Sequence, residues 1–101
     1  MKLLVFICRE SLQEDLFSFI KEEGIHAYTV AFSLQGTGET GPAFGDLMTH
    51  GANALVLSAL PDEQAVRARE GFKVFREQLS QRQQGAAVPM KLMVLPCEEM
   101  I

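Results

Sequence analysis

Residues 53–63 read NALVLSALPDE, and this stretch decides the fold. Residues 53–60 form a nearly continuous apolar run, which is the pattern of a β-strand that is buried on both faces. Pro61 ends the run, and the acidic residues Asp62 and Glu63 suit the first turn of a helix, where the helix dipole is positive. The stretch therefore predicts a buried strand that leads directly into a helix.

The residues that follow continue this strand–helix pattern. Apolar side chains recur at helical spacing on one face, at Ala65, Ala68, Phe72, Phe75 and Leu79. Gly71 falls inside this helix, where we expect it to lower helix stability modestly or to bend the helix. The polar segment SQRQQG, residues 80–85, ends the helix, and Met90 to Leu95 is predicted to be the last strand.

The N-terminal half begins with a second two-sided apolar strand, Lys2 to Cys8. The sequence Ser11-Leu12-Gln13-Glu14 matches a capping box, which marks the start of a helix, and Gly24 is its natural end. Residues 28–34 then alternate apolar and smaller or polar side chains, which predicts a half-buried strand.

The predicted order is βαββαβ, so the fold class is α+β and ferredoxin-like, with one domain over residues 1–101. We expect a four-stranded antiparallel sheet with two helices on one face. Crossover connections place the first and third strands together at the centre, and we expect that central pair to be parallel.

The sheet face without helices has a consequence for assembly. One side of each apolar strand, together with Thr29, Ala31 and Ser33, would line it. An exposed apolar face of this size is unusual in a monomer, so we infer that another copy of the chain covers it. This reasoning leaves dimer and trimer open.

Composition excludes several classes of function. The net charge of −4 gives no basic footprint for nucleic acid or for an anionic membrane, and the N-terminal apolar run is too short to span a bilayer, so we expect a cytoplasmic protein.

The two cysteines, Cys8 and Cys97, fall at opposite ends of the predicted sheet, roughly 20 Å apart at about 3.3 Å per residue. An intrachain disulfide is therefore not expected.

The segment from Gly36 to Ala52 is far longer than a turn between antiparallel neighbours requires. It is rich in glycine, and no lysine or arginine lies between residues 34 and 46. A nucleotide loop, a mobile recognition loop and a long turn are all consistent with this pattern, although loops of this length are usually functional.

Residues 28–63 resemble the corresponding part of the PII-like signalling proteins. The resemblance implies that this chain is a divergent member of the nitrogen regulatory PII superfamily. The matching positions are Thr29, Val30, Gly36, Gly38, Gly41 and the junction Leu60-Pro61-Asp62-Glu63. The resemblance implies a homotrimer whose sheets face inward and whose inter-subunit clefts bind an adenine nucleotide. It further implies that residues 36–52 form the T-loop, which contacts a target protein such as a transporter or an enzyme. The ligand-binding residues so implied are Thr29, Gly36, Thr37, Gly38, Glu39 and Gly41.

This chain departs from the family at its phosphate contacts. The segment QRQQGAAVPMK, residues 81–91, lacks the family's basic glycine-rich phosphate loop, and the last residues, CEEMI, are acidic. Backbone amides between Gly36 and Gly41 could instead form an anion-binding nest. We therefore expect a ligand of low charge, namely AMP, ADP or cyclic AMP, in preference to ATP.

Two other classes of function remain as alternatives. One is a small dimeric ferredoxin-like enzyme, but no convergent set of acid, base and cation can be found by spacing, so no catalytic residue is predicted. The other is a metal-binding protein that uses His26, His50, Glu39 and Asp46, but these residues lack metal-ligand spacing and no metal site is predicted. Oligomer size separates the trimeric sensor from the dimeric enzyme.

Overall fold

The computed structural model describes residues 1–38, 41–43 and 52–101. Its strands are β1 (Lys2–Arg9), β2 (Thr29–Leu34), β3 (Gly36–Gly38), β4 (Gly41–Ala43), β5 (Asn53–Leu60) and β6 (Met90–Pro96). Its helices are α1 (Gln13–Glu22) and α2 (Asp62–Arg82), and a short 3-10 turn at Glu10–Leu12 precedes α1. The predicted third strand, residues 53–60, has the bounds of β5.

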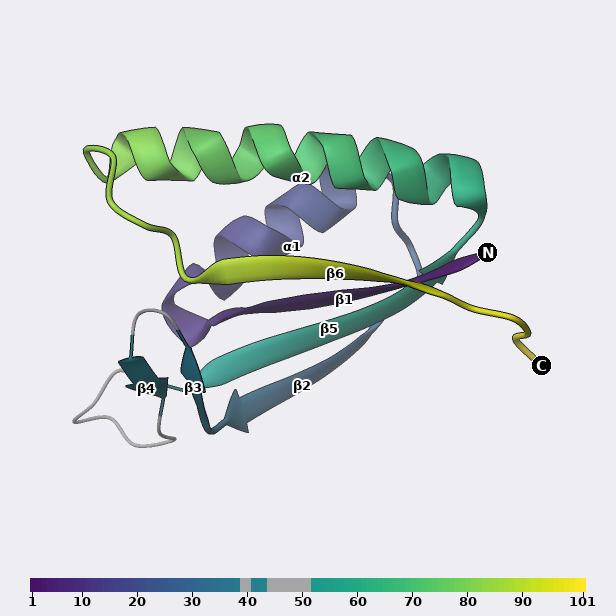
Figure 1. Cartoon of the computed structure of the whole chain (residues 1–101), viewed down its shortest axis with the longest axis horizontal. Coiled ribbons are helices and arrows are strands. Elements are labelled where there is room, and N and C mark those ends of the chain that lie inside the picture. Colours follow the sequence, from purple (N-terminus) through teal and green to yellow (C-terminus); the bar gives the residue numbers. More distant parts are fainter. Residues whose placement is uncertain (39–40, 44–51) are drawn as a thin grey trace.

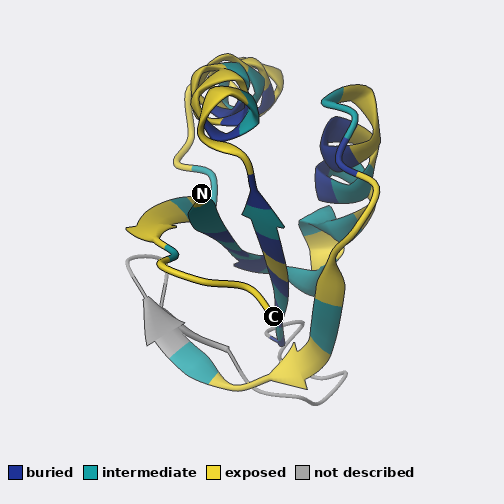
Figure 2. Cartoon of the chain, turned by 90° about the vertical axis from the view of Figure 1, so that its right-hand side faces the viewer, coloured by how far each residue is buried: buried dark blue, intermediate teal, exposed yellow. Residues whose placement is uncertain are grey.

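The main sheet has the order β2-β5-β1-β6, and every neighbouring pair in it is antiparallel. Both helices lie on one face of this sheet (Figures 1 and 2). The predicted ferredoxin-like α+β fold is confirmed. A second, two-stranded sheet pairs β3 with β4 near the end of β2.

The prediction that the central pair is parallel is wrong, because β1 pairs antiparallel with β5. Each helical crossover joins two parallel strands that lie on either side of a third strand. The α1 crossover goes from β1 to β2 past β5, and the α2 crossover goes from β5 to β6 past β1. Parallel strands are therefore never neighbours in this sheet.

The core lies between the helices and one face of the sheet (Figure 2). Alternate residues of β1 (Leu4, Phe6 and Cys8) are buried there because successive side chains of a strand point to opposite faces. Phe6 contacts Phe19 of α1, with ring centroids 6.3 Å apart, and Phe72 of α2, with centroids 5.8 Å apart. These contacts fix both helices to the same face.

The opposite face of the sheet carries apolar side chains that no described element covers. Val5 of β1 is paired with Leu57 of β5 and with Met93 of β6, and the neighbouring positions on this open face include Leu3, Ile7, Leu55 and Leu95. Leu57 is 36% exposed and Met93 is 45% exposed. In the single chain the central strands are thus covered on one face only.

The predicted capping box does not form. Ser11 lies in the 3-10 turn, and α1 begins at Gln13 without a side-chain hydrogen bond at its N-cap. An N-cap residue needs an extended backbone, whereas Ser11 already has the helical backbone of the turn. The turn between β1 and α1 therefore moves the helix start beyond Ser11.

Gly71 does not end α2, which is continuous from Asp62 to Arg82. A Cβ atom at position 71 would lie only 2.0 Å from Oε1 of Glu23 and 3.5 Å from Cε1 of Phe19. The glycine lets α2 approach the end of α1, and a larger residue would require the Glu23 side chain to move.

The two cysteines are free and lie at opposite ends of β1, as predicted. Cys8 is paired with Met90, whereas the Cys97 N–H donates a hydrogen bond to the Met1 carbonyl at 3.1 Å. Burial, and secondarily the negative charge of Glu10, raise the pKa of the Cys8 thiol to about 11. Within the described parts of the chain, no helix is long and apolar enough to cross a membrane.

We expect Cys97 to react with a thiol reagent in the native protein at pH 8, and Cys8 to react only after denaturation. The thiolate is the reactive species, and a buried thiol with a raised pKa supplies very little of it. Labelling followed by mass spectrometry measures the site, and a Cys97→Ser variant is the control. Rapid native labelling of that variant would contradict the burial of Cys8.

Candidate functional site

The predicted ligand-binding glycines lie in a small hairpin at the end of β2. In this hairpin Gly36 is paired with Ala43, Thr37 with Pro42, and Gly38 with Gly41. The structure thus brings together Gly36, Thr37, Gly38 and Gly41, whereas Glu39 lies outside the described residues. Extended strands turn successive N–H groups to opposite sides. The described residues of the loop are extended strands, and residues 39–40 of the predicted nest lie outside the described residues.

The end of β1 fastens the base of this loop. The Glu10 carboxylate accepts a hydrogen bond from the Ser33 N–H, at an irregularity in β2 where Ser33 has a φ of +57°. The Glu10 N–H donates to the Ala52 carbonyl at 2.9 Å, on the other side of the loop. The neighbouring Arg9 N–H donates to the Pro89 carbonyl at 3.2 Å. Arg9 and Glu10 therefore hold together three segments that are distant in sequence: the end of β2, the residue before β5 and the residue before β6.

Sequence reasoning missed this role of Glu10. The local signal was weak, because the carboxylate bonds to a backbone group 23 positions away, across the sheet. The acidic residue directly after an apolar strand was visible, but its partner depends on the bulge in β2, which the alternation of residues 28–34 did not indicate.

Thr29 lies at the other end of β2 from the hairpin. It is paired with Leu57, is exposed, and belongs to the open face. At about 3.3 Å per residue, roughly 20 Å of strand separate Thr29 from Gly36. One chain therefore does not bring Thr29 together with the glycine hairpin, and a cleft that contains both needs a second copy.

Two cations lie on the open face at the loop end of the sheet. Arg9 is paired with Asn53, and Lys91 is paired with Ile7. Both positions follow the period of two that places Val5 and Met93 on this face. Sequence reasoning looked for phosphate contacts only in residues 81–91 and in the C-terminal residues, although the strand period was the signal that would have found Arg9.

Gly36 is close to these residues. A Cβ atom at Gly36 would lie 3.2 Å from Nδ2 of Asn53, which is tighter than ordinary van der Waals contact. The absence of a side chain at Gly36 thus lets the chain pass Asn53 as it enters the hairpin. The close packing against Asn53 therefore explains why a glycine is suited to position 36, which is one of the predicted site residues.

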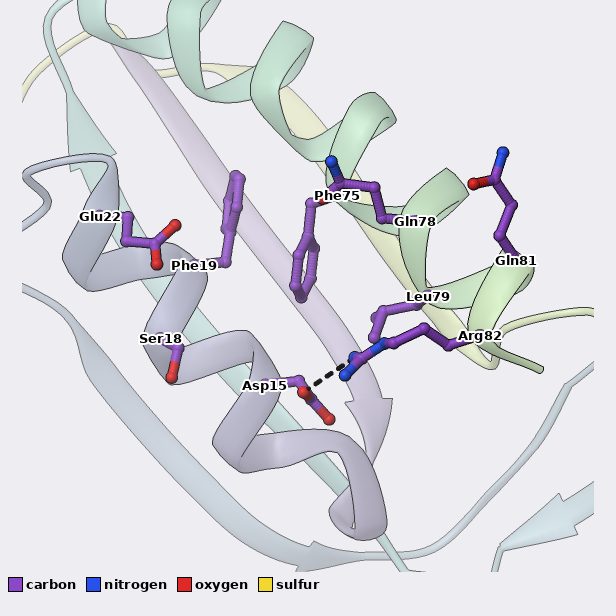
Figure 3. Close-up of a pocket in the computed structure, with 9 residues that line it drawn as sticks. All are labelled: Asp15, Ser18, Phe19, Glu22, Phe75, Gln78, Leu79, Gln81 and Arg82. Atoms are coloured by element: carbon purple, nitrogen blue, oxygen red, sulfur yellow. Dashed lines mark hydrogen bonds and ion pairs between the residues drawn. The ribbon is translucent and has the colours of Figure 1, made fainter.

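The helix side of the molecule has a separate pocket between α1 and α2, with a volume of about 640 Å³ (Figure 3). Phe19 and Phe75 are stacked in it, with centroids 4.8 Å apart, and Arg82 Nη2 lies 3.1 Å from Asp15 Oδ1 across the pocket. This ion pair is largely exposed, so we expect it to contribute little to stability. The pocket lies on the face opposite to the predicted ligand residues.

In the part of the chain that the structure describes, no three histidine, cysteine or acidic side chains lie close enough together to bind a metal ion. His26 is exposed in the segment before β2. The other metal-ligand candidates, His50, Glu39 and Asp46, lie outside the described residues.

Comparison with known proteins gives solved structures only: no family model matches the chain, and no curated protein matches it. CPII, a nitrogen regulatory PII-like protein from Thiomonas intermedia, matches in a structure bound to ADP and bicarbonate. That match has 27% identity and a TM-score of 0.70, and covers 92% of this chain and 81% of that chain. CPII bound to ADP, AMP and bicarbonate matches at 22% identity and a TM-score of 0.68, over 93% and 88% of the two chains.

A protein of Thermus thermophilus, described as PII-like and signalling, matches at 19% identity and a TM-score of 0.58. The match covers 92% of this chain and 82% of that chain. Together these structures support a divergent PII-like protein, as the resemblance of residues 28–63 had indicated.

We expect Glu10→Ala to lower the free energy of unfolding by about 1 kcal/mol, because the Ser33 N–H loses its acceptor. The Ser33 amide should also exchange its hydrogen faster. Glu10→Gln is the matched control, since it keeps an acceptor oxygen at nearly the same position. Urea unfolding and hydrogen exchange measure the two effects, and equal exchange at Ser33 in all three proteins would contradict the fastening role.

Proposed function

We propose that this chain is a PII-like sensor that forms a homotrimer, binds an adenine nucleotide in clefts between subunits, and signals to a target protein through residues 36–52. The observation that carries the proposal is the separation of Thr29 from the glycine hairpin along β2. Residues that match one ligand-binding motif lie at the two ends of strand β2, and an assembly with its open faces inward can bring such residues together from different copies.

The open face supports self-association. Leu57 and Met93 are exposed on it, beside the partly buried Val5, and burying such side chains is favourable by about 25 cal/mol for each Å² of apolar surface. A second copy is the most economical cover, since it carries the same face. The choice of three copies rests on the resemblance to PII-like proteins and not on the single chain.

The proposed cleft combines the hairpin base of one copy with Thr29 of the next. Gly36 and Gly38 would supply backbone N–H groups at its rim, and the Thr29 hydroxyl would hydrogen-bond the adenine or the ribose. Arg9 and Lys91, on the open face near the hairpin, are the cations closest in the sheet to this rim. In this proposal they contact the phosphates in place of the family's basic loop.

The charge of the protein favours some nucleotides over others as the ligand. The chain has a net charge of −4 and lacks the basic glycine-rich loop, so ADP, AMP or cyclic AMP fits the proposed cleft better than ATP. The related CPII structures hold ADP and AMP, which supports the adenine ligands, and bicarbonate, which adds a small anion to those worth testing. Cyclic AMP is proposed on charge alone.

The remaining parts of the proposal follow from the family resemblance. We propose a regulatory protein and not an enzyme, acting in the cytoplasm, whose target is a transporter or an enzyme, with nitrogen regulation as the first process to examine. The candidate ligand residues remain Thr29, Gly36, Thr37, Gly38, Glu39 and Gly41. The dimeric enzyme has no observation in its favour among the described residues, and a dimer in solution would revive it.

We expect Leu57→Asp to disrupt the trimer at micromolar concentration, because it would place a charge in the buried interface. Val56 is unsuitable for this test, since it faces the helices and is 0% exposed. Val66→Asp, at an α2 position that is 49% exposed, is the matched control. Light scattering coupled to gel filtration measures the mass, and a monomeric wild-type protein would overturn the assembly.

We expect micromolar affinity for ADP or AMP by calorimetry, weaker binding of ATP, and a loss of about tenfold in Thr29→Val, which removes one hydroxyl hydrogen bond. Gly36→Val should weaken binding further, because its side chain would press against Asn53. Val66→Thr serves as the control. Submicromolar ATP binding would contradict the charge argument, and the absence of heat with every nucleotide would contradict the nucleotide site.

A further inference from the structure

The strand β6 forms one edge of the sheet, and no described strand pairs with its outer side. Apolar side chains are exposed on both of its faces: Met93 is 45%, Val94 39% and Leu95 42% exposed. Its one charged residue is Lys91. A long apolar edge with so little charge is a template for pairing with another strand unless something covers it.

A groove of about 600 Å³ runs between this edge and the C-terminal half of α2. The α2 side is lined by Lys73, Arg76, Glu77 and Ser80. Arg76 is held in position, because its Nη1 donates to the Met90 carbonyl at 3.4 Å and its guanidinium carbon lies 5.7 Å from the centroid of the Phe72 ring. A fixed guanidinium loses little freedom when it binds a carboxylate.

The groove is basic in an acidic protein. Lys73 and Arg76 line it against the single carboxylate of Glu77, while the whole chain has a net charge of −4. Lys73 lies 3.4 Å from Glu70, but both side chains are more than half exposed, so this pair is weak and exchangeable. An extended acidic segment fits such a site, with its backbone along β6 and one carboxylate of each alternating pair toward α2.

The chain itself contains a segment of this chemistry, the tail at residues 97–101, CEEMI. Glu98 and Glu99 are acidic, and the apolar side chains of Met100 and Ile101 are exposed. The tail leaves the sheet beside Met1, at the end of β6 opposite to Met90 (Figure 1). About 20 Å of strand lie between, at about 3.3 Å per residue, so five residues that must first reverse direction do not reach Arg76 of their own chain.

We propose that the tail of a second copy, residues 97–101, docks in the groove between α2 and β6. It adds a short strand to the free edge of β6. Because successive side chains of a strand point to opposite faces, one of Glu98 and Glu99 lies against Arg76 and Lys73, and the other points away from α2. The contact is head-to-tail, and such contacts form a closed ring of identical subunits when the rotation between neighbouring copies closes. This inference rests on the self-association in the proposed function, and it is independent of the nucleotide.

Hydrogen exchange of the tail amides in the assembled protein tests the docking. We expect the amides of residues 98–101 to be protected in the wild type and to exchange at least tenfold faster in Arg76→Glu, since one charge-assisted contact corresponds to a tenfold change or more. Glu98→Lys with Glu99→Lys should have the same effect. Combining these changes with Arg76→Glu should restore protection, which a merely destabilised α2 would not do.

A crosslink identifies which copy supplies the tail. With Met93→Cys, mild oxidation should join Cys97 of one copy to the new cysteine of another, which non-reducing electrophoresis detects as linked chains. Met93→Cys with Cys97→Ser, and Val66→Cys, are the controls. A crosslink within one chain would overturn the proposal. A trimer whose tail amides exchange freely would overturn the docking and leave the proposed function intact, whereas a monomer would overturn the assembly itself.

Discussion

Phe6, in the middle of the central strand β1, contacts Phe19 of α1 and Phe72 of α2, and the rest of the structure depends on this three-ring contact. It holds both helices on one face of the sheet and gives the short chain a single core (Figure 2). The same contact leaves the other face without cover, because neither described helix is left to place there. The proposed assembly would therefore be a consequence of how the core is built.

The candidate site takes its form from the same arrangement. Because β1 is central, its last residues meet the loop base, the start of β5 and the segment before β6, and Glu10 and Arg9 hydrogen-bond to all three. The open face brings Arg9 and Lys91 to this end of the sheet and Thr29 to the other. The proposed ligand site uses both ends and would be built between copies, so we expect binding and assembly to be thermodynamically linked.

The pocket between α1 and α2 and the groove between α2 and β6 differ in the interactions that they can make with a partner. The pocket between α1 and α2 is closed at one end by the Asp15–Arg82 ion pair and has mixed polar and aromatic walls (Figure 3). The groove along β6 combines a free strand edge with a fixed arginine. Of these two sites, the groove combines a strand edge for backbone pairing with a positive charge. These are the two features that bind an extended acidic segment.

The sequence by itself determined the four strands of the main sheet, the two helices and the fold class, because the periods of strands and helices involve residues that are close together in the chain. Residues 53–60 are the strand that the apolar run predicted, and the glycine motif of residues 28–63 identified the type of fold. Only the tertiary structure decided the direction of the central pair, the partner of Glu10, and the distance between Thr29 and Gly36. Each of these depends on which strands become neighbours and in what register, and that is set by contacts between residues far apart in the chain.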